Sequence, residues 1–429
     1  YNLFINESRM SCFACSTASP DEDLDMAGHS EKAYPVKQSK AQTLVQKMLH
    51  PPDVQINGNR PWDIRIHHPR FYERVLSGGS LALGESYMDG WWDCEALDQF
   101  FERILGDRLD KKATRNSIGL LYPILIAKIR NAQNRSNAYV IGKRHYDIGN
   151  HLFSLMLDPW FNYSCGYWEN AETLEKAQEA KLDLICRKIG LQPGMKVLDI
   201  GCGWGGFAKY SAINYGATVH GITVSQEQVK FAQTFCKGLD VQIELKDYRD
   251  VFEKYDRIVS IGMFEHVGYK NYRHFMKVIH RCLNDEGLFL LHTIGGNTSV
   301  YSTDPWIRKY IFPNSMLPSA KQITSASQGL FVLEDWHSFG HYYDHTLMAW
   351  YRNFTKNWSE LSGIYDERFY RMWSYYLLSC AGSFRSRRNQ LWQIAFSKNG
   401  IKGGYQYRQS TLTPSQKPAP GHGHGSVVI

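Results

Sequence analysis

The chain has 429 residues, of which 43% are hydrophobic and 21% charged, and its formal net charge is +7. This composition is typical of a globular protein and excludes an intrinsically disordered one, and the length accommodates a large domain and a smaller one. No apolar run reaches the roughly 18 residues that a membrane-spanning helix needs. The 9 cysteines follow no disulfide-framework spacing, which favours reduced thiols and a cytoplasmic location.

The N-terminal part divides into a leader and a compact block. We expect residues 1–39 to form a disordered leader. Residues 40–110 are patterned separately and predict a small α+β domain, with helices over 41–48 and 71–76 and short strands over 54–56 and 63–66. Three glycines (Gly78, Gly79 and Gly84) and an aromatic run that ends at Trp91-Trp92 follow the second helix.

A basic segment over residues 111–141 links this block to the rest of the chain. Residues 111–145 carry several Lys and Arg and no acidic residue, and the apolar run 118–127 lies inside them. An apolar segment with basic flanks suits binding at an anionic membrane surface. A linker helix that packs on the next domain with its charges solvated explains the same pattern equally well. Nucleic-acid binding is a third interpretation, but no nucleic-acid-binding module is recognisable, so we expect no nucleic-acid partner.

Residues 142–404 predict a catalytic domain in which helices and strands alternate. Buried strands in this alternation indicate a doubly wound α/β sheet that is mostly parallel. The expected elements are helix 172–189, strand 196–200, helix 204–215, strand 217–223, helix 226–237, strand 241–245, strand 256–261, helix 270–283 and strand 287–293.

The pattern changes after Gly296. About 35 residues without periodicity have the length of a binding loop or lid. Helices over 343–360 and 366–382 follow, and we expect the last strand, 391–396, to run antiparallel. The tail 405–429 is rich in Gly, Pro, Ser and His and is expected to be disordered.

The segment 196–206 is a buried strand followed by glycines at G-x-G-x-x-G spacing, which brings backbone close to a nucleotide-like ligand. A dinucleotide-binding fold would place an acidic residue about 20 positions further on. Residues 220–225 contain none, whereas Asp199 precedes the turn. The arrangement resembles motif I of the class I methyltransferases that use S-adenosylmethionine (SAM), so an NAD-dependent dehydrogenase is the weaker alternative.

Five further motifs occur together and in order: His145–Asn150, Tyr163–Cys165, Gly262–Gly268, Leu291–Gly295 and Phe339–Tyr343. From about residue 40 to 400 the chain resembles the bacterial cyclopropane-fatty-acyl-phospholipid synthases, which are related to the mycobacterial mycolic acid cyclopropane synthases. The resemblance implies transfer of a methylene from SAM to the cis double bond of an unsaturated acyl chain in a membrane phospholipid. It also implies a homodimer, lipid engagement or dimerisation by residues 40–110, and a cytoplasmic enzyme held peripherally on the inner membrane surface. A methyl-branched lipid is the alternative product of the same first step.

The resemblance implies a bound bicarbonate as the base that removes a proton. Its side-chain ligands would be Glu265, His292 and Tyr343, and its backbone ligands Cys165 and Ile294. Glu265 follows the fourth strand and His292 ends the fifth, so both are expected where doubly wound sheets bind ligands. His266 is expected to point away from Glu265 by strand alternation.

The cofactor contacts implied by the resemblance come from several loops, and we expect no metal site. They are Tyr163, Ser164, Gly201, Gly203, Thr223, Val224, Gln228, Tyr248 and Ile261.

Two further groups of residues are candidates. The resemblance nominates Cys380 as an active-site residue, but its spacing on the helix predicts a buried face, where a free cysteine acts as a small hydrophobe. Aromatic faces stabilise a carbocation without being methylated, although core packing explains each ring as well. The candidate rings are Tyr163, Phe264, Trp306, Tyr310 and Tyr343.

Overall fold

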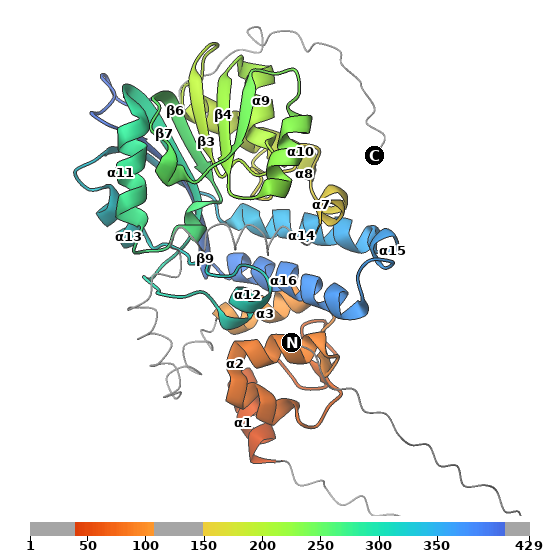
Figure 1. Cartoon of the computed structure of the whole chain (residues 1–429). Helices are drawn as coiled ribbons and strands as arrows, with labels where there is room; N and C mark the ends of the chain where they lie inside the picture. The colour runs from red at the N-terminus through yellow and green to blue at the C-terminus, as the bar shows by residue number, and fades with distance from the viewer. Residues whose placement is uncertain (1–38, 107–148, 408–429) are drawn as a thin grey trace, which may run out of the picture. The chain divides into compact units, whose positions relative to one another are not determined.

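The computed structural model describes residues 39–106 and 149–407 (Figure 1). The expected leader, the basic segment 111–141, the start of the His145–Asn150 motif and nearly all of the tail lie outside the described residues. The described residues from Lys40 onward belong to one compact unit. Within the described ranges, no helix combines the length and hydrophobicity needed to cross a membrane.

A seven-stranded sheet forms the centre of this unit, with strand order β5-β4-β3-β6-β7-β9-β8. The five strands from β5 to β7 are parallel, and β9 pairs antiparallel with both β7 and β8. This confirms the expected doubly wound, mostly parallel sheet with an antiparallel last strand. The strands are β3 (Lys196–Ile200), β4 (Thr218–Thr223), β5 (Val241–Leu245), β6 (Tyr255–Ile261), β7 (Leu283–Gly296), β8 (Val332–Ser338) and β9 (Asn389–Ser397).

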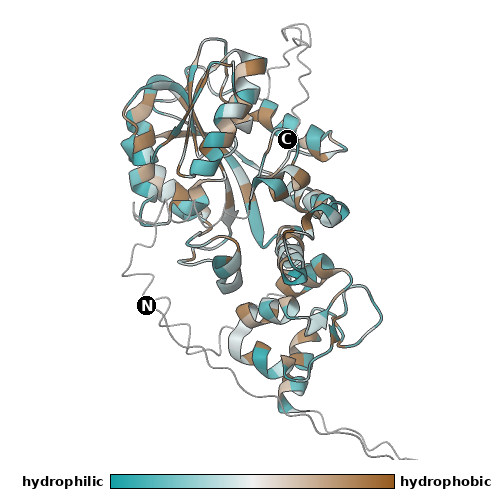
Figure 2. Cartoon of the chain, turned by 45° about the vertical axis from the view of Figure 1, so that its right-hand side comes forward, coloured by the Kyte–Doolittle hydropathy of each residue, from teal (hydrophilic) through white to brown (hydrophobic). Residues whose placement is uncertain are grey.

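Helices cover both faces of the sheet, and strand alternation divides the core between them (Figures 1 and 2). On β3, Leu198 packs with the cluster that includes Phe275 of α11, whereas Val197 packs with the cluster that includes Ile185 of α8. The sequence therefore buries both faces of each central strand, as parallel sheets require. The flanking helices are α8 (Leu174–Lys188), α9 (Gly206–Tyr215), α10 (Gln226–Phe235), α11 (Tyr272–Cys282) and α13 (Ala320–Ser327).

The region after Gly296 contains more structure than the sequence predicted. Its helix α12 (Pro305–Tyr310) has Asp304 as N-cap, and β8 adds an edge strand to the sheet. β8 was missed because its residues are exposed or half-buried and include Glu334 and Asp335, so no apolar alternation marks it. Charged residues are common on edge strands, where they discourage pairing with other chains.

The N-terminal elements are α1 (Lys40–Leu49), β1 (Arg65–Ile66), α2 (Phe71–Met88), β2 (Trp92–Asp93) and α3 (Leu97–Gly106). The first predicted strand is reduced to a bridge between Ile56 and Ile64. The prediction that the second helix ends at residue 76 is wrong, because α2 continues beyond a kink at Gly79, whose φ is 57°. A positive φ is accessible to glycine without strain, so the chain can resume the helix there.

Helix α16 (Glu367–Arg385) packs against both α3 and α14 (His341–Lys356). At Gly382, an added Cβ would lie 2.5 Å from the Asp98 carbonyl oxygen, so the two helices approach as closely as glycine allows. Arg385 donates to Asp98 at 2.7 Å and to Asp344 at 2.8 Å, which joins all three helices. The remaining elements are α7 (Asn150–Met156), α15 (Trp358–Leu361) and the 3-10 turns η2 (Tyr248–Asp250) and η3 (Phe264–His266).

Candidate active site

A cavity of about 2050 Å³ lies at the carboxyl ends of the parallel strands. All nine expected cofactor contacts line it, and so do Glu265, Ile294, Tyr343 and Cys380. His292 and Cys165 are instead buried behind its surface, at 1% and 0% exposure. The cavity continues from the glycine loop to side chains of α1, α2 and α3. Its size is about twice the upper end of the usual range for small-molecule pockets.

The glycine loop has the conformation that its sequence requires. Gly201 and Gly203 have φ values of 81° and 57°, in the region that other residues rarely adopt. A Cβ at position 201 would also lie 2.7 Å from the side chain of Met263. The helix begins at Gly206 rather than at the predicted Trp204, because Gly205 takes a left-handed conformation at the N-cap.

A second group of the expected cofactor contacts follows β4 and β5. Thr223 donates a hydrogen bond to the Gln228 side chain at 2.7 Å, so these two predicted contacts are held together. Tyr248 packs edge-on against Phe275, with ring centroids 5.2 Å apart. Its hydroxyl is buried and has no hydrogen-bond partner among the described residues.

A buried lysine, which the sequence interpretation missed, supports the segment that carries Tyr163 and Ser164. Lys181 of α8 is fully buried and donates to Asn162 at 2.7 Å and to the Ser164 hydroxyl at 3.1 Å. Burial lowers the pKa of Lys181 to about 8. The available signal was its position on the buried stripe of α8, between Ala177 and Ile185.

Asp199 lies beside this lysine at the end of β3. Its carboxyl is 1% exposed, and burial raises its pKa to about 7, opposed by the positive charge of Lys181. The Oδ1 atom has no hydrogen-bond partner among the described residues. Asp199 also lines the cavity, so a ligand group there could satisfy this oxygen.

Glu265 lies in η3, after β6, and its Oε1 accepts a hydrogen bond from the Ile294 N–H at 2.7 Å. Its other oxygen, Oε2, is buried and unpartnered within the described ranges. Burial raises the pKa of Glu265 to about 7. The site therefore holds a carboxyl group that is poised between its two protonation states near neutral pH.

His292 lies on β7, two residues before Ile294. Gln393 Nε2 lies 3.2 Å from its Nδ1, and burial lowers the His292 pKa well below its usual value, so the ring is neutral. With the Gln393 amide in this orientation its nitrogen donates, so the assigned tautomer has Nδ1 as acceptor and the ring proton on Nε2. This Nε2 is buried without a hydrogen-bond partner in the described part of the chain.

Tyr343 and Cys165 approach the same region from α14 and from the loop after α7. Burial raises the pKa of Tyr343 well above its usual value, and the nearby Cys165 and Glu265 raise it further. The Tyr343 ring packs on Phe384 at 4.5 Å. Burial also raises the pKa of the Cys165 thiol, whose sulfur donates to its neighbour's carbonyl, Gly166 O, at 3.2 Å. Cys165 is thus protonated and unreactive.

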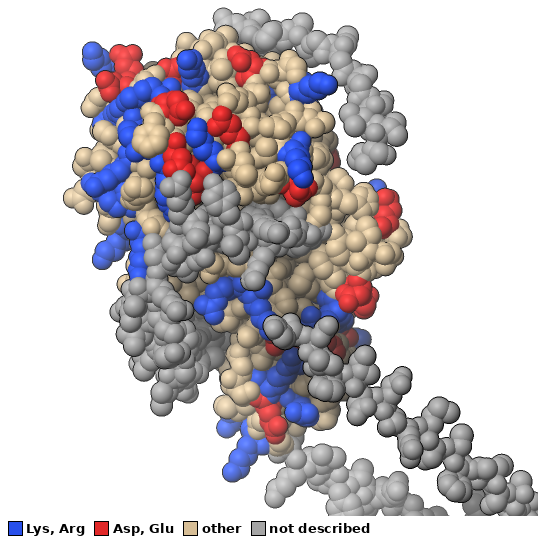
Figure 3. All heavy atoms as spheres, in the orientation of Figure 1, with Lys and Arg blue, Asp and Glu red and all other residues tan. Residues whose placement is uncertain are grey.

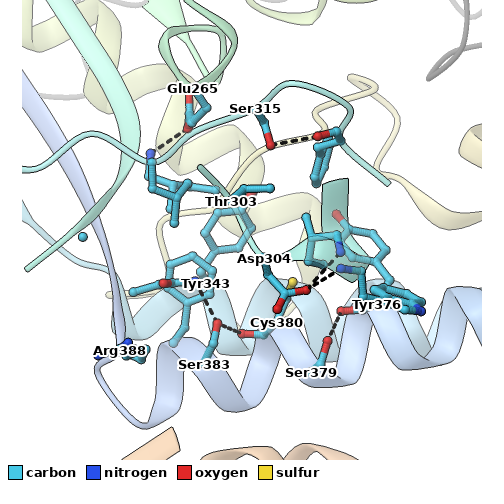
Figure 4. Close-up of a pocket in the computed structure, with 18 of the residues that line it drawn as sticks. Glu265, Thr303, Asp304, Ser315, Tyr343, Tyr376, Ser379, Cys380, Ser383 and Arg388 are labelled. Atoms are coloured by element: carbon cyan, nitrogen blue, oxygen red, sulfur yellow. Dashed lines mark hydrogen bonds between the residues drawn. The ribbon is translucent and has the colours of Figure 1, made fainter. Parts of the chain in front are cut away.

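Cys380 is more exposed to the cavity than its sequence pattern predicted. It is half-buried and lines the cavity, on the face of α16 that also carries Tyr376, Ser379 and Ser383 (Figure 4). The predicted buried face is confirmed at Trp373 and Tyr376 but not at Cys380, because the cavity extends over this part of the helix. Burial, with a smaller effect of Asp304, raises the pKa of the Cys380 thiol to about 12, so it is not a nucleophile at neutral pH.

Three of the five aromatic candidates line the cavity, and two do not. Tyr163, Trp306 and Tyr343 line it. Phe264 does not, since it stacks on Tyr272 in the core at 4.2 Å. Tyr310 lies outside the lining and donates to Glu85 at 2.9 Å.

The five aromatic candidates do not include several other aromatic residues of the lining, among them Phe312, Tyr376 and Phe384. Tyr163 donates to the Tyr376 hydroxyl at 2.8 Å, which fixes both rings at the cavity wall. No local motif marks these residues, because they come from the loop after α12 and from α16.

His266 also differs from expectation. It lies in the 3-10 turn rather than on a strand, so the argument from strand alternation is wrong, and it lines the cavity. Burial lowers its pKa to about 4. Within the described residues, no group of three metal-ligating side chains occurs.

Comparison with known proteins places this geometry in a family. The sequence model for "Mycolic acid cyclopropane synthetase" matches residues 133–394. The chain belongs to this family. Cyclopropane-fatty-acyl-phospholipid synthase of Escherichia coli K12 is 54% identical over 361 residues, which are 84% of this chain and 94% of that protein. A probable fatty acid methyltransferase of Pseudomonas putida is 35% identical over 353 residues, 77% of this chain and 86% of the relative.

Comparison with solved structures of the cyclopropane synthetase family supports the same assignment. The mycolic acid cyclopropane synthase CmaA1 complexed with SAH and CTAB matches with a TM-score of 0.57 and 33% identity, over 61% of this chain and 98% of that one. The protein is therefore an enzyme with the fold of SAM-dependent methyltransferases. The residues present fit SAM. Nothing lies within 4 Å of a Cβ added at Gly203, so a ligand can approach the backbone there. Asp199 Oδ1 and the Tyr248 hydroxyl are buried polar groups that have no partner in the described part of the chain and that a ligand can satisfy.

Proposed function

We propose that this enzyme adds a methylene from SAM across the cis double bond of an unsaturated acyl chain in a membrane phospholipid, forming a cyclopropane ring. The observation that carries the proposal is the continuous cavity, in which the glycine loop, Glu265 and apolar side chains of α1 to α3 line one space. An alkene is a poor nucleophile, so catalysis depends on aligning it with the methyl donor, and a shared cavity permits that alignment. The name of the 54% identical relative supports the same substrate.

In this proposal SAM supplies an electrophilic methyl group. The side chains that face the cavity from the loops after β3, β4 and β5 hold it, together with the segment that Lys181 supports. Tyr163, Tyr343 and Tyr376 present ring faces and edges to the positive charge that develops on the acyl chain. The proposed cofactor contacts remain Tyr163, Ser164, Gly201, Gly203, Thr223, Val224, Gln228, Tyr248 and Ile261.

We also propose that a bicarbonate ion supplies the base. Glu265 Oε2 would accept a hydrogen bond from it, and His292 Nε2 and the Tyr343 hydroxyl would donate to it. The two unpartnered buried atoms, Glu265 Oε2 and His292 Nε2, support this assignment, since a bicarbonate offers both donor and acceptors. Backbone groups of Cys165 and Ile294 complete the proposed set, and the Ile294 N–H would be shared with Glu265.

The decisive experiment identifies the lipid product. Purified enzyme is incubated with SAM and vesicles of dioleoyl phospholipid, and the acyl chains are analysed by mass spectrometry and proton NMR. We expect one added CH₂, loss of the vinyl protons and the appearance of ring protons. The second candidate, methyl branching, is favoured by the name of the Pseudomonas putida relative. A new methyl signal without ring protons would establish it instead.

We further propose that the enzyme is a homodimer of the cytoplasm that binds the anionic inner membrane surface peripherally, through residues 40–110 and the basic segment 111–141. Figure 3 shows Lys and Arg over the region of α12 and α2, where Arg308 and Lys309 lie. Reversing several charges in 111–145 should weaken binding to anionic vesicles at low salt, because each basic residue near such a surface contributes about 1 kcal/mol. Unchanged binding would refute the membrane role. Light scattering of the purified enzyme tests the dimer.

A further inference from the structure

The lining of the cavity is apolar in one part and polar in another. Beyond the catalytic groups its walls are apolar, with Leu76 of α2 and Phe101 and Leu105 of α3. Another part of the lining is polar and comes from two segments that meet where β7 ends and β9 begins, since Gly296 and Asn389 are paired. These polar lining residues are Asn297, Thr298, Ser302, Thr303, Arg387 and Arg388. An apolar wall that ends in a polar and cationic one matches an amphiphile with an anionic head.

Arg387 occupies an unusual backbone position in this polar part. It follows the C-terminal residue of α16 by two positions and has a φ of 60°, where helices usually place glycine. An L-residue pays about 1–2 kcal/mol for this conformation. The backbone around it is nevertheless well held, because Arg387 O accepts from Asn297 Nδ2 at 3.2 Å and from Gln390 Nε2 at 2.8 Å. A fixed, strained position that carries a charge at a cavity suggests a binding role.

The guanidinium of Arg387 has capacity for a ligand. It is exposed, and Nη2 donates to the neutral Gln390 side chain at 2.8 Å. Across residues 39–106 and 149–407, Arg387 makes no ion pair with a carboxylate, whereas Arg385 pairs with Asp98 and Asp344. A guanidinium has five N–H donors in a planar fork that matches phosphate oxygens, so most of the Arg387 donors remain available.

Asp304 is the acidic residue of the same loop and also lines the cavity, but it forms no ion pair with Arg387 within residues 39–106 and 149–407. Its Oδ1 accepts instead from the N–H groups of Trp306 and Ile307 at the start of α12. Figure 4 places Arg388 at the C-terminal end of α16, on the side of Ser383 and Tyr343. Two adjacent cations therefore border the space that leads to the catalytic groups.

We propose that Arg387, with Arg388 beside it, binds a phosphodiester group: the phosphate of the phospholipid whose unsaturated chain reaches Glu265. This assignment rests on the proposed function and adds to it the part of the substrate that the enzyme recognises by charge. Bidentate Arg–phosphate hydrogen bonds would anchor the head group, while the apolar wall from α1 to α3 holds the acyl chains. Recognition of the phosphate rather than of a particular alcohol leaves the rest of the head group free.

The test variant is Arg387→Gly, because glycine removes the guanidinium and relieves the backbone strain, so its Tm should equal or exceed that of the parent enzyme. Arg352→Gln, an exposed arginine of α14 outside the cavity lining, is the matched control. Initial rates are measured with dioleoyl phosphatidylglycerol and with dioleoylglycerol, which has the same chains and no phosphate, both in mixed micelles. SAM affinity is measured by calorimetry.

We expect Arg387→Gly to raise KM for the phospholipid about tenfold, the equivalent of one charge-assisted hydrogen bond, with unchanged kcat, SAM affinity and dioleoylglycerol kinetics. An equal effect on both lipids, or none on either, would overturn the proposal. Inhibition of the parent enzyme by millimolar inorganic phosphate that Arg387→Gly abolishes, without a change in phospholipid KM, would assign the site to free phosphate and also overturn it. If the parent converts neither lipid but binds phospholipid micelles in an Arg387-dependent way, the proposed reaction is refuted and the proposed phosphate site is supported.

Discussion

Lys181 Nζ lies 3.1 Å from the Ser164 hydroxyl, so a buried ammonium on α8 directly supports the loop that lines the proposed cofactor end of the cavity. The same helix donates from Gln178 Nε2 to the Ser164 carbonyl at 2.7 Å. Asp158 completes the support, since its carboxylate accepts from the N–H of Trp160 at 2.9 Å and from that of Asn162 at 2.9 Å. The position of Tyr163 and Ser164 therefore depends on α8 rather than on the loop alone.

Replacing Lys181 by Met should weaken SAM binding about tenfold, because the lost hydrogen bond to Ser164 is charge-assisted. It should also destabilise the fold by about 3 kcal/mol, since buried carboxyl groups lose their counter-charge. Lys188→Met is the matched control: Lys188 is equally buried on the same helix but pairs with Asp335 at 3.3 Å. Calorimetric titration and thermal unfolding separate the two effects. Equal losses of SAM affinity in both variants would show that Lys181 acts through stability alone.

Glu265→Gln should stabilise the protein at alkaline pH. Burial raises the pKa of Glu265 from 4.5 to about 7 in the folded state, so the carboxyl binds its proton more tightly when folded. The folded state consequently loses stability as pH rises from about 4.5 to 7, by about 3 kcal/mol at most. Gln keeps the acceptor for the Ile294 N–H and cannot ionise. Its Tm should exceed that of the parent at pH 8 and match it near pH 5, and an equal difference at both pH values would contradict the assignment.

The same substitution should abolish most turnover. We expect kcat to fall at least about 100-fold with unchanged SAM affinity, because a group that positions a general base contributes on this scale. In the parent enzyme, kcat should fall as pH decreases through about 7, when Glu265 becomes protonated. His266→Gln, on the neighbouring position of the same turn, is the control and should retain turnover. A large loss of SAM affinity in Glu265→Gln would place this residue in the cofactor site instead.

Gly382→Ala should destabilise the contact between α16 and α3. The added methyl would lie 2.5 Å from the Asp98 carbonyl oxygen and 2.7 Å from the Glu102 nitrogen, and backbone atoms cannot move aside as a side chain can. Overpacking of this kind costs about 1–3 kcal/mol. Gly363→Ala is the control, since nothing lies within 4 Å of its added Cβ. Thermal unfolding of the two variants should differ by several degrees, and equal Tm values would show that α3 can shift freely.

Cys380→Ser should remain active, with kcat within about threefold of the parent, because a thiol with a pKa of about 12 carries no negative charge at neutral pH. A bulky thiol reagent should still inhibit the parent, since Cys380 lines the cavity and the adduct would fill it. Cys380→Ser should resist that reagent. Inactive Cys380→Ser with an unchanged Tm would give the sulfur a chemical role.

The sheet could be predicted from sequence because each central strand is buried on both faces and separated from the next by an amphipathic helix. The same reasoning predicted the position of the proposed catalytic groups only in part. Glu265 and His292 follow or end predicted strands, so their place at the carboxyl edge follows from topology. The hydrogen bond from Ile294 to Glu265 depends on the turn η3, which no periodic pattern indicates.

Other features required tertiary information. Helix α2 passes through Gly78-Gly79, a local signal that favours a break, because packing against α1, α12 and α16 holds both halves. Lys181 is a charged residue on a buried helix face, and its burial is explained only by its hydrogen-bond partners Asn162 and Ser164. Tyr376 reaches Tyr163 across 213 positions of sequence, a contact that single-sequence patterns cannot contain.

The continuity of the cavity also has a consequence for inhibition. Since the walls that surround Asp199 and Tyr248 and those formed by Phe101 and Leu105 enclose one space, a single compound can occupy both halves. A nucleoside joined through a thioether to a long alkyl chain would gain binding free energy from contacts in both regions, while it loses its translational freedom only once. Such a ligand should bind far more tightly than its nucleoside or its alkyl half alone, and its optimal linker length would measure the distance between cofactor and double bond in solution.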